Sequence, residues 1–282
     1  MLYLGISREN RFSPNRIISD KAIFDDVCKN IATDDDLLFK MSEEEFSCDG
    51  AENPSLIDAV FHMCRSDRSL KRLKEMEGMG VTVVNSAQGV INCRRAEEVR
   101  LLQGNGASFV KSRIVTAADG VPEDWTGFPC WVKRGDSHAM KMDDVCYAAD
   151  RAECAAVLKD MAERGFAEAV LQEHAQGKIC KFYGIGQGLF FQYSFLDNVG
   201  SGKFGLEKYN EIGKADVDEA RFRHDVAEIA GILGVDVYGG DAVVGPDGHA
   251  VIVDFNDWPS FFVCHKEAAP VISELIRSKA AR

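Results

Sequence analysis

The sequence lacks the residue clusters that usually hold zinc. Its nine cysteines are scattered, with no pair at CxxC spacing, and its six histidines form no group at ligand spacing. An odd, dispersed set of cysteines in a chain without a secretion signal is typical of reduced thiols in the cytoplasm. We therefore expect no zinc site. The cysteines are Cys28, Cys48, Cys64, Cys93, Cys130, Cys146, Cys154, Cys180 and Cys264.

Long apolar runs and a basic leader are also missing. No stretch approaches the ~20 apolar residues that cross a bilayer, and the N-terminal segment MLYLGISREN has no basic region before an apolar one. With 45 acidic and 33 basic residues, the net charge is −12. That excess argues against nucleic acid or an anionic membrane as the main partner. The sequence predicts a globular protein of the cytoplasm, without internal repeats.

Three oxygen-bearing side chains, those of Asp241, Asp254 and Asn256, are the most informative feature that is present. We expect two strands, 235–244 and 249–255, joined by a Gly-Pro-Asp-Gly turn. Side chains alternate along strands, so the three residues are expected on one face. Carboxylate and amide oxygens are ligands suited to Mg²⁺. The alternative is a hairpin whose acids are solvated, but these acids interrupt an apolar run, where an unpaired charge is costly.

The placement of Asp241 depends on the strand register. If Val244 pairs with His249, then Gly239 opposes Asp254 and Asp241 becomes a diagonal neighbour of Asp254, about 7 Å away. A slip by one residue would remove Asp241 from the set.

The N-terminal part, residues 1–104, alternates short apolar strands with helices, as in an open α/β sheet. The loop after the first strand carries Arg8, Arg11 and Arg16, where open sheets bind ligands; a charged surface loop is an equally good interpretation. The expected strands are 1–6, 36–40, 58–63 and 81–84, and the expected helices are 20–32, 66–78 and 94–104.

Residues 105–175 and 176–282 are expected to form two further α+β units. A glycine-rich, charged segment, 197–211, is expected to be a mobile loop. The expected strands are 107–115, 130–134, 142–147, 168–173, 178–186 and 189–195, and the expected helices are 150–164, 216–233 and 264–279.

Two lysines on strands carry further chemistry. Lys133 precedes a Gly-Asp-Ser-His turn, and Lys181 lies on a later strand. A lysine can hold nucleotide phosphates as a point charge, and the backbone N–H groups of the turn could add an anion site. Each lysine alone is weak evidence, because strand lysines are usually exposed.

The order of these features resembles the ATP-grasp superfamily: a strand lysine, a QEH segment, a K-x-Y strand, a glycine-rich loop, a helix, and a hairpin with GGD and D-x-N. The resemblance covers residues from about 95 to 261. It implies an N-terminal open α/β domain that binds a small-molecule acceptor and two α+β subdomains that clasp ATP. It also implies one or two Mg²⁺ ions, or Mn²⁺, at Asp241, Asp254 and Asn256.

The resemblance also assigns roles to other residues. Lys133 and Lys181 would hold the ATP phosphates, and Ser194 matches a position near the nucleotide. His138 falls where some relatives place a histidine that contacts phosphate or substrate. The adenine hinge would be Gln172, Glu173, His174 and Ala175.

The sequence leaves the reaction open between two branches. Ligases of the superfamily often carry Glu-x-Asn, where this chain has Asp254-Phe255-Asn256, a form similar to the inositol-phosphate kinase branch. Against a kinase, no dense basic cluster is visible. We expect ligation of an activated carboxylate to an amine, with a kinase of a small polyol or inositol phosphate as the alternative and a nucleotide-binding protein without catalysis as the third hypothesis. Arg94 and Arg95 are expected to cap or flank a helix. The basic residues of the N-terminal domain that a kinase would need to bring together are Arg8, Arg11, Arg16, Arg65, Arg68, Lys71 and Arg72.

Overall fold

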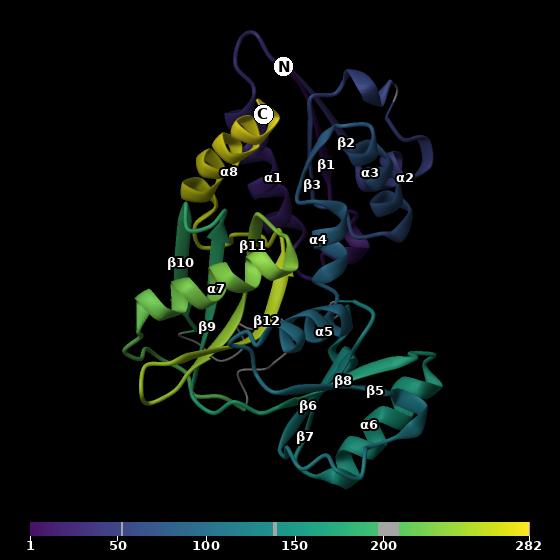
Figure 1. Ribbon diagram of the computed structural model, residues 1–282, viewed down its shortest axis with the longest axis vertical. Helices are drawn as coiled ribbons and strands as arrows, with labels where there is room; N and C mark the ends of the chain where they lie inside the picture. Colours follow the sequence, from purple (N-terminus) through teal and green to yellow (C-terminus); the bar gives the residue numbers. More distant parts are fainter. Residues whose placement is uncertain (52, 138–139, 197–208, 282) are drawn as a thin grey trace.

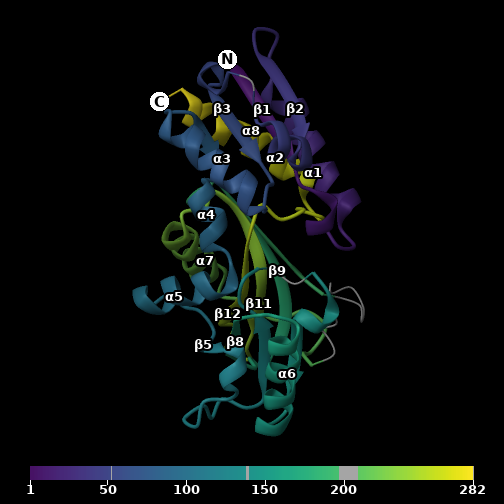
Figure 2. The ribbon, with the colours of Figure 1, turned by 90° about the vertical axis from the view of Figure 1, so that its right-hand side faces the viewer.

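The computed structural model describes residues 1–51, 53–137, 140–196 and 209–281. Within these ranges the chain forms three four-stranded sheets. They are arranged along the long axis of the molecule, with the sheet that comes last in the sequence between the other two (Figure 1). The side view places the first sheet with α1, α3 and α8 at one end and α6 at the other (Figure 2). This mixed α/β architecture confirms the expected fold class. No helix of the described ranges is both long enough and apolar enough to cross a membrane.

The first sheet is parallel, in the order β2-β1-β3-β4, and each of its strands was predicted. Two short helices, α2 (Glu43–Asp49) and α4 (Ala87–Asn92), were not predicted; Ser42 begins α2 with a capping box. The other elements are β1 (Leu2–Ser7), α1 (Ile17–Ile31), β2 (Leu37–Ser42), β3 (Ala59–His62), α3 (Asp67–Gly78) and β4 (Thr82–Val84).

The last helix, α8 (His265–Ala280), returns to the first sheet and packs against α1 (Figure 1). Its Ile272 and Ile276 are fully buried in the same apolar cluster as Phe61 of β3 and Val27 of α1. Both ends of the chain therefore contribute to one core.

The second sheet is antiparallel, in the order β5-β8-β6-β7. Its side chains alternate as expected: Cys130 and Val132 face α6, whereas Trp131 and Lys133 point to the opposite side. The predicted strand 107–115 is divided, because Val110 donates its N–H to Ile252 of the third sheet. The elements are α5 (Arg95–Asn105), β5 (Ser112–Thr116), β6 (Cys130–Arg134), β7 (Val145–Ala148), α6 (Arg151–Glu163) and β8 (Glu168–Glu173).

The third sheet is antiparallel, in the order β10-β9-β11-β12, and α7 covers one of its faces. Phe182 and Phe255 pack beneath α7, so the residues next to them in each strand point to the other face. Most of the predicted loop 197–211 lies outside the described residues. The elements are β9 (Lys178–Ile185), β10 (Phe190–Phe195), α7 (Glu219–Leu233), β11 (Val237–Val244) and β12 (Ala250–Asp257).

The predicted register of the last hairpin is wrong. Val244 pairs with Ala250 rather than with His249, and the register shifts again after Ala242, so that Asp241 faces Asp254 directly. The first slip alone would turn Asp241 to the other face. The β-bulge adds one residue on β12 and restores it.

A buried histidine and a buried asparagine connect the first sheet to the third. Nε2 of His62 lies 2.8 Å from the carbonyl oxygen of Asn85, and its Nδ1 accepts a hydrogen bond from the N–H of Cys64 at 3.1 Å. The side chain of Asn85 in turn bonds the backbone of Val237 in both directions. Burial lowers the pKa of His62 below its ordinary 6.5.

We expect the free energy of unfolding to fall as the pH falls through 6.5, because the unfolded chain then binds a proton that buried His62 resists. The slope is at most about 1.4 kcal/mol per pH unit for one group. Urea unfolding at a series of pH values should show a shallower acid loss for His62→Gln, whereas His224→Gln, on the exposed side of α7, should keep the parental slope. Equal slopes in all three proteins would contradict this.

Candidate active site

Four of the residues singled out in the sequence form one row across the third sheet. The register pairs Ser194 of β10 with Lys181 of β9, Lys181 with Asp241 of β11, and Asp241 with Asp254 of β12. Directly paired residues share a face, and this row lies on the face away from α7. Asn256 joins it by donating its Nδ2–H to Oδ2 of Asp254 at 2.9 Å. The structure thus brings the candidate metal ligands together.

Each candidate carboxylate already has a cation of the chain beside it. Nζ of Lys181 lies 2.6 Å from Oδ1 of Asp241, and Nε of Arg95 lies 3.4 Å from Oδ1 of Asp254. The acids are therefore not simply solvated, as in the alternative interpretation of the hairpin. They belong to a charged cluster that is partly shielded from water.

Lys133 reaches this cluster from the second sheet. Its Nζ donates to the carbonyl oxygen of Val253 at 2.9 Å, and Val253 is the residue of the bulge that has no partner in the register. The side chain is buried, and burial lowers the pKa of Lys133 to about 8, although the charge of Asp254 opposes this shift. A buried lysine ammonium in this position can bind an anion such as a phosphate.

Helix α5 contributes two residues whose place sequence reasoning missed. Arg95 begins α5, as expected, but its guanidinium contacts Asp254. Glu98 is buried, burial and then the charge of Asp254 raise its pKa well above the usual range, and its Oε1 has no hydrogen-bond partner among the described residues. Arg95, Glu98 and Leu102 share one helical face, and two charges on an apolar face were the available signal.

Of the four predicted hinge residues, Gln172 and Glu173 end β8, and His174 and Ala175 follow it. All but His174 line a narrow pocket between the second and third sheets. Gln172 donates to Oγ of Ser112 at 3.3 Å, and the carbonyl oxygen of Ala175 accepts from Nδ2 of Asn210 at 3.1 Å. The pocket is lined by Trp131, Lys133, Gln172, Glu173, Ala175, Ile179, Asn210, Val243 and Val253. Its volume of about 20 Å³ suits roughly one water, so a larger guest requires lining residues to move apart.

Aromatic rings gather around Trp131, which lines this pocket. Trp131 donates its Nε1–H to Nδ1 of His174 at 3.1 Å, and burial lowers the pKa of His174. Tyr147 and Tyr209 stack with ring centroids 4.0 Å apart beside them. Glu173 is turned outward to an ion pair with Lys111 at 2.6 Å.

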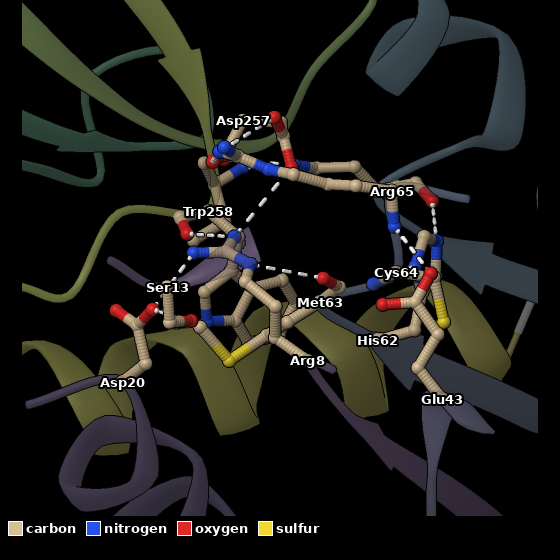
Figure 3. Close-up of polar contacts among 12 residues, drawn as sticks. Arg8, Ser13, Asp20, Glu43, His62, Met63, Cys64, Arg65, Asp257 and Trp258 are labelled. Atoms are coloured by element: carbon tan, nitrogen blue, oxygen red, sulfur yellow. Dashed lines mark hydrogen bonds and ion pairs between the residues drawn. The ribbon is translucent and has the colours of Figure 1, made fainter. Parts of the chain in front are cut away.

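The three arginines of the first loop do not act as one group. Arg8 is buried: it donates to the carbonyl oxygen of Trp258 at 2.8 Å and pairs with Asp20 at 3.1 Å. Figure 3 shows Arg8 below Asp257. Asp257 also pairs with Arg65, whose Nη2 lies 3.1 Å from its Oδ1. Arg16 lies over the ring of Phe262, 5.2 Å from its centroid.

Arg11 instead lines a second, wider pocket of about 320 Å³. The same pocket includes Ser137 and Met140, which flank His138, a residue outside the described ranges. Arg68 and Arg72 contact the carbonyl oxygen of Cys48 and, with Lys71, are not among the described residues that line the pocket. The lining is Arg11, Phe12, Arg65, Ser66, Asp67, Val90, Arg94, Arg134, Asp136, Ser137, Met140 and Asp257.

A buried carboxylate shapes this pocket. Glu43 is fully buried, and its oxygens accept hydrogen bonds from the backbone N–H groups of Glu9 at 3.1 Å, Arg65 at 2.8 Å and Ser66 at 2.7 Å. It thereby ties the loop after β1 to the loop after β3, at the carboxyl ends of the parallel strands.

Comparisons with known proteins agree with this architecture. No protein-family model matches the sequence, and no curated protein sequence resembles it significantly. Among solved structures, D-alanine–D-alanine ligase from Bacillus anthracis complexed with ATP is similar at a TM-score of 0.74 and 13% identity, over 100% of this chain and 98% of that one. The D-alanine–D-alanine ligase of Coxiella burnetii is similar at a TM-score of 0.67 and 12% identity, over 100% and 94% of the two chains. The VanG D-Ala:D-Ser ligase of Enterococcus faecalis is similar at 0.69 and 14%, over 99% and 98%. These ligases are members of the ATP-grasp superfamily, and the chain has the ATP-grasp fold.

Proposed function

We propose that this protein is an ATP-dependent ligase, which activates a small-molecule carboxylate and joins it to an amine. The observation that carries the proposal is the meeting of Lys133, from one sheet, with Lys181, Asp241 and Asp254, from the facing sheet. Phosphoryl transfer needs charge neutralisation and positioning more than covalent help from the protein. Full-length similarity to carboxylate–amine ligases supports the same reaction class.

The residues suit a magnesium ion. Asp241, Asp254 and Asn256 offer hard oxygen ligands, and the unpartnered Oε1 of Glu98 lies in the same cluster. When bound, one or two Mg²⁺ ions would neutralise charge on the phosphates.

The other residues would bind and orient the reactants. Lys133 and Lys181 would hold the phosphates, with Ser194 beside them, and the segment from Gln172 to Ala175 would bind adenine after residues that line the narrow pocket move apart. The substrate carboxylate would attack the γ-phosphate from the wider pocket, which breaks the bond to the β,γ-bridging oxygen, releases ADP and forms an acyl phosphate. The amine would then attack the acyl carbon and release inorganic phosphate and a proton. Nine free thiols support a place in the reducing cytoplasm.

Metal and nucleotide should strengthen each other's binding, because the candidate ligands are occupied by cations of the chain. Removing Lys181 leaves Asp241 without its partner, so Lys181→Met should bind Mn²⁺ alone several-fold more tightly, yet bind ATP at least about tenfold more weakly. Titration of Mn²⁺ followed by electron paramagnetic resonance measures the first effect, and calorimetry measures the second. Lys178→Met, on the same strand but bonded to the carbonyl oxygen of Lys214, should change neither. If Lys181→Met bound both Mn²⁺ and ATP more weakly, Lys181 would not be competing with the metal ion for Asp241.

The reaction is tested by measuring ADP and phosphate release from Mg²⁺-ATP with panels of carboxylates and amines. A ligase releases free phosphate only when a carboxylate and an amine are both present. Nucleotide binding without stimulation by any acceptor would instead support a protein that has lost catalysis.

A kinase is the second candidate. The observation in its favour is the four guanidinium groups of Arg11, Arg65, Arg94 and Arg134 around the wider pocket, a density suited to a phosphorylated polyol. ADP formed together with a phosphorylated polyol, and without free phosphate, would establish this reaction instead.

A further inference from the structure

The wider pocket draws arginines from four separate segments of the chain. Arg11 follows β1, Arg65 follows β3, Arg94 precedes α5, and Arg134 ends β6. We propose that this pocket binds a second anionic group of the acceptor, so that the acceptor is a small molecule with two anionic ends, a dicarboxylate or a phosphorylated carboxylate. This inference rests on the proposed ligase function and names its substrate class.

The charges that line the pocket favour an anion. Four arginines stand against three aspartates, and each aspartate is already paired with one of the arginines: Asp67 with Arg94, Asp136 with Arg134, and Asp257 with Arg65. The fourth, Arg11, pairs with Glu9 at 2.9 Å, but Glu9 is not among the described residues that line the pocket. The lining of the pocket thus carries more positive than negative charge, although the whole chain has a net charge of −12. This local charge favours the binding of an anion.

Two of these ion pairs can be exchanged at little cost. The side chain of Asp67 is 84% exposed and that of Asp136 is 60% exposed, and pairs with such carboxylates are worth about 0–1 kcal/mol. Arg8 differs, because its side chain is 5% exposed and its partner Asp20 is 8% exposed. Arg94 is therefore available to a ligand, and Arg134 can exchange Asp136 while it keeps its second partner, the buried Asp144 at 3.2 Å. Arg8 is a structural residue.

One unsatisfied donor belongs to a residue that lines this pocket. Nε of Arg65 is buried and has no hydrogen-bond partner among the described residues, which normally costs free energy unless a ligand satisfies the donor. Ser66 and Asp67, the cap and first residue of the twelve-residue helix α3, also line the pocket. The N-terminus of a helix adds a partial positive charge and free N–H groups.

The pocket adjoins the candidate metal site. Arg95 connects the two: its Nε lies 3.4 Å from Oδ1 of Asp254, and its Nη1 donates to the carbonyl oxygen of Ser137, which lines the pocket, at 3.2 Å. An acceptor can thus place its reacting carboxylate beside the metal ligands and its second anionic group among Arg11, Arg65 and Arg94.

The test is calorimetry with Mg²⁺ and a non-hydrolysable ATP analogue, using three acids of one carbon-chain length: a monocarboxylate, a dicarboxylate and a phosphorylated carboxylate. We expect at least one of the two dianions to bind ten or more times as tightly as the monocarboxylate, and the arm that does so identifies the second group. Arg94→Gln should remove this preference without changing the affinity for the ATP analogue. Asp67→Asn, which releases Arg94, should strengthen it, and Arg68→Gln, one position beyond Asp67 and outside the lining, should leave it unchanged.

Other results separate this inference from the proposed function. Equal binding of all three acids, no binding of any, or an undiminished preference in Arg94→Gln would overturn the dianion pocket. Phosphate release from a monocarboxylate–amine pair would then leave the ligase standing. If dianions bound tightly in a way that depends on Arg94, but no amine stimulated phosphate release, the inference about the pocket would stand and the proposed ligase function would be wrong.

Discussion

Asp254→Asn is expected to reduce ATP turnover at least about a hundredfold. The change removes one negative charge from the candidate metal site and leaves Arg95, which now faces Asp254 at 3.4 Å, without its partner. Charge stabilisation by a bound metal ion is worth several kcal/mol, and each 1.36 kcal/mol is a factor of ten in rate. ADP production at saturating Mg²⁺-ATP measures the effect.

The matched control is Asp247→Asn, in the turn of the same hairpin. Asp247 accepts a hydrogen bond from the N–H of His249 through its Oδ1 at 3.1 Å, and asparagine keeps that acceptor, so turnover should stay at the parental rate. Unchanged Mg²⁺-dependent ADP production in Asp254→Asn would remove Asp254 from the metal site.

Lys133→Met is expected to weaken ATP binding about thirtyfold or more. Truncating one member of a buried charged contact costs about 2–5 kcal/mol, and 1.4 kcal/mol is tenfold in affinity. Methionine retains most of the length and apolar volume, so the packing of β6 should survive. Calorimetric titration with a non-hydrolysable ATP analogue gives the dissociation constant.

Circular dichroism and thermal unfolding show whether the variant is folded, since Lys133 also donates to Val253. Lys159→Met, at an exposed position of α6, should bind the analogue as the parent does. If a folded Lys133→Met did so too, Lys133 would have no part in nucleotide binding.

Much of the fold could be predicted because local signals agree with the final structure. Each strand of the first sheet was expected within two residues, because each is a short apolar run bounded by turn-forming or helical segments. The short helices α2 and α4, seven and six residues long, were missed because so few residues leave little periodicity. The divided segment 107–115 was missed because its first half pairs with a strand that is distant in the sequence.

The candidate site was predictable in its residues more than in its geometry. The row of Ser194, Lys181, Asp241 and Asp254 depends on three strand registers, one of them bulged at Val253. Alternation predicts which residues share a face, but it does not reveal where an extra residue resets that alternation.

The arginines show the same limit. Arg8, Arg11 and Arg16 lie within nine residues of one loop, yet one is buried, one lines a pocket and one covers a ring. The places of Arg8 and Arg16 are set by Asp20, Asp257 and Phe262, which lie outside this loop, whereas Arg11 pairs with Glu9 of the loop itself.

Because α8 completes the core beneath the first sheet, the order of synthesis and the order of folding differ in this chain. The strands of the first sheet are all made once Val84 has been added, but Ile272 and Ile276, which pack against them, follow only about 190 residues later. At roughly 5–20 residues per second, the nascent sheet waits tens of seconds with part of its apolar face uncovered, while the second sheet already has all of its strands. A ribosome that stops before α8 would therefore release a chain in which the earliest-made of the three sheets keeps part of its apolar face open to proteases and chaperones.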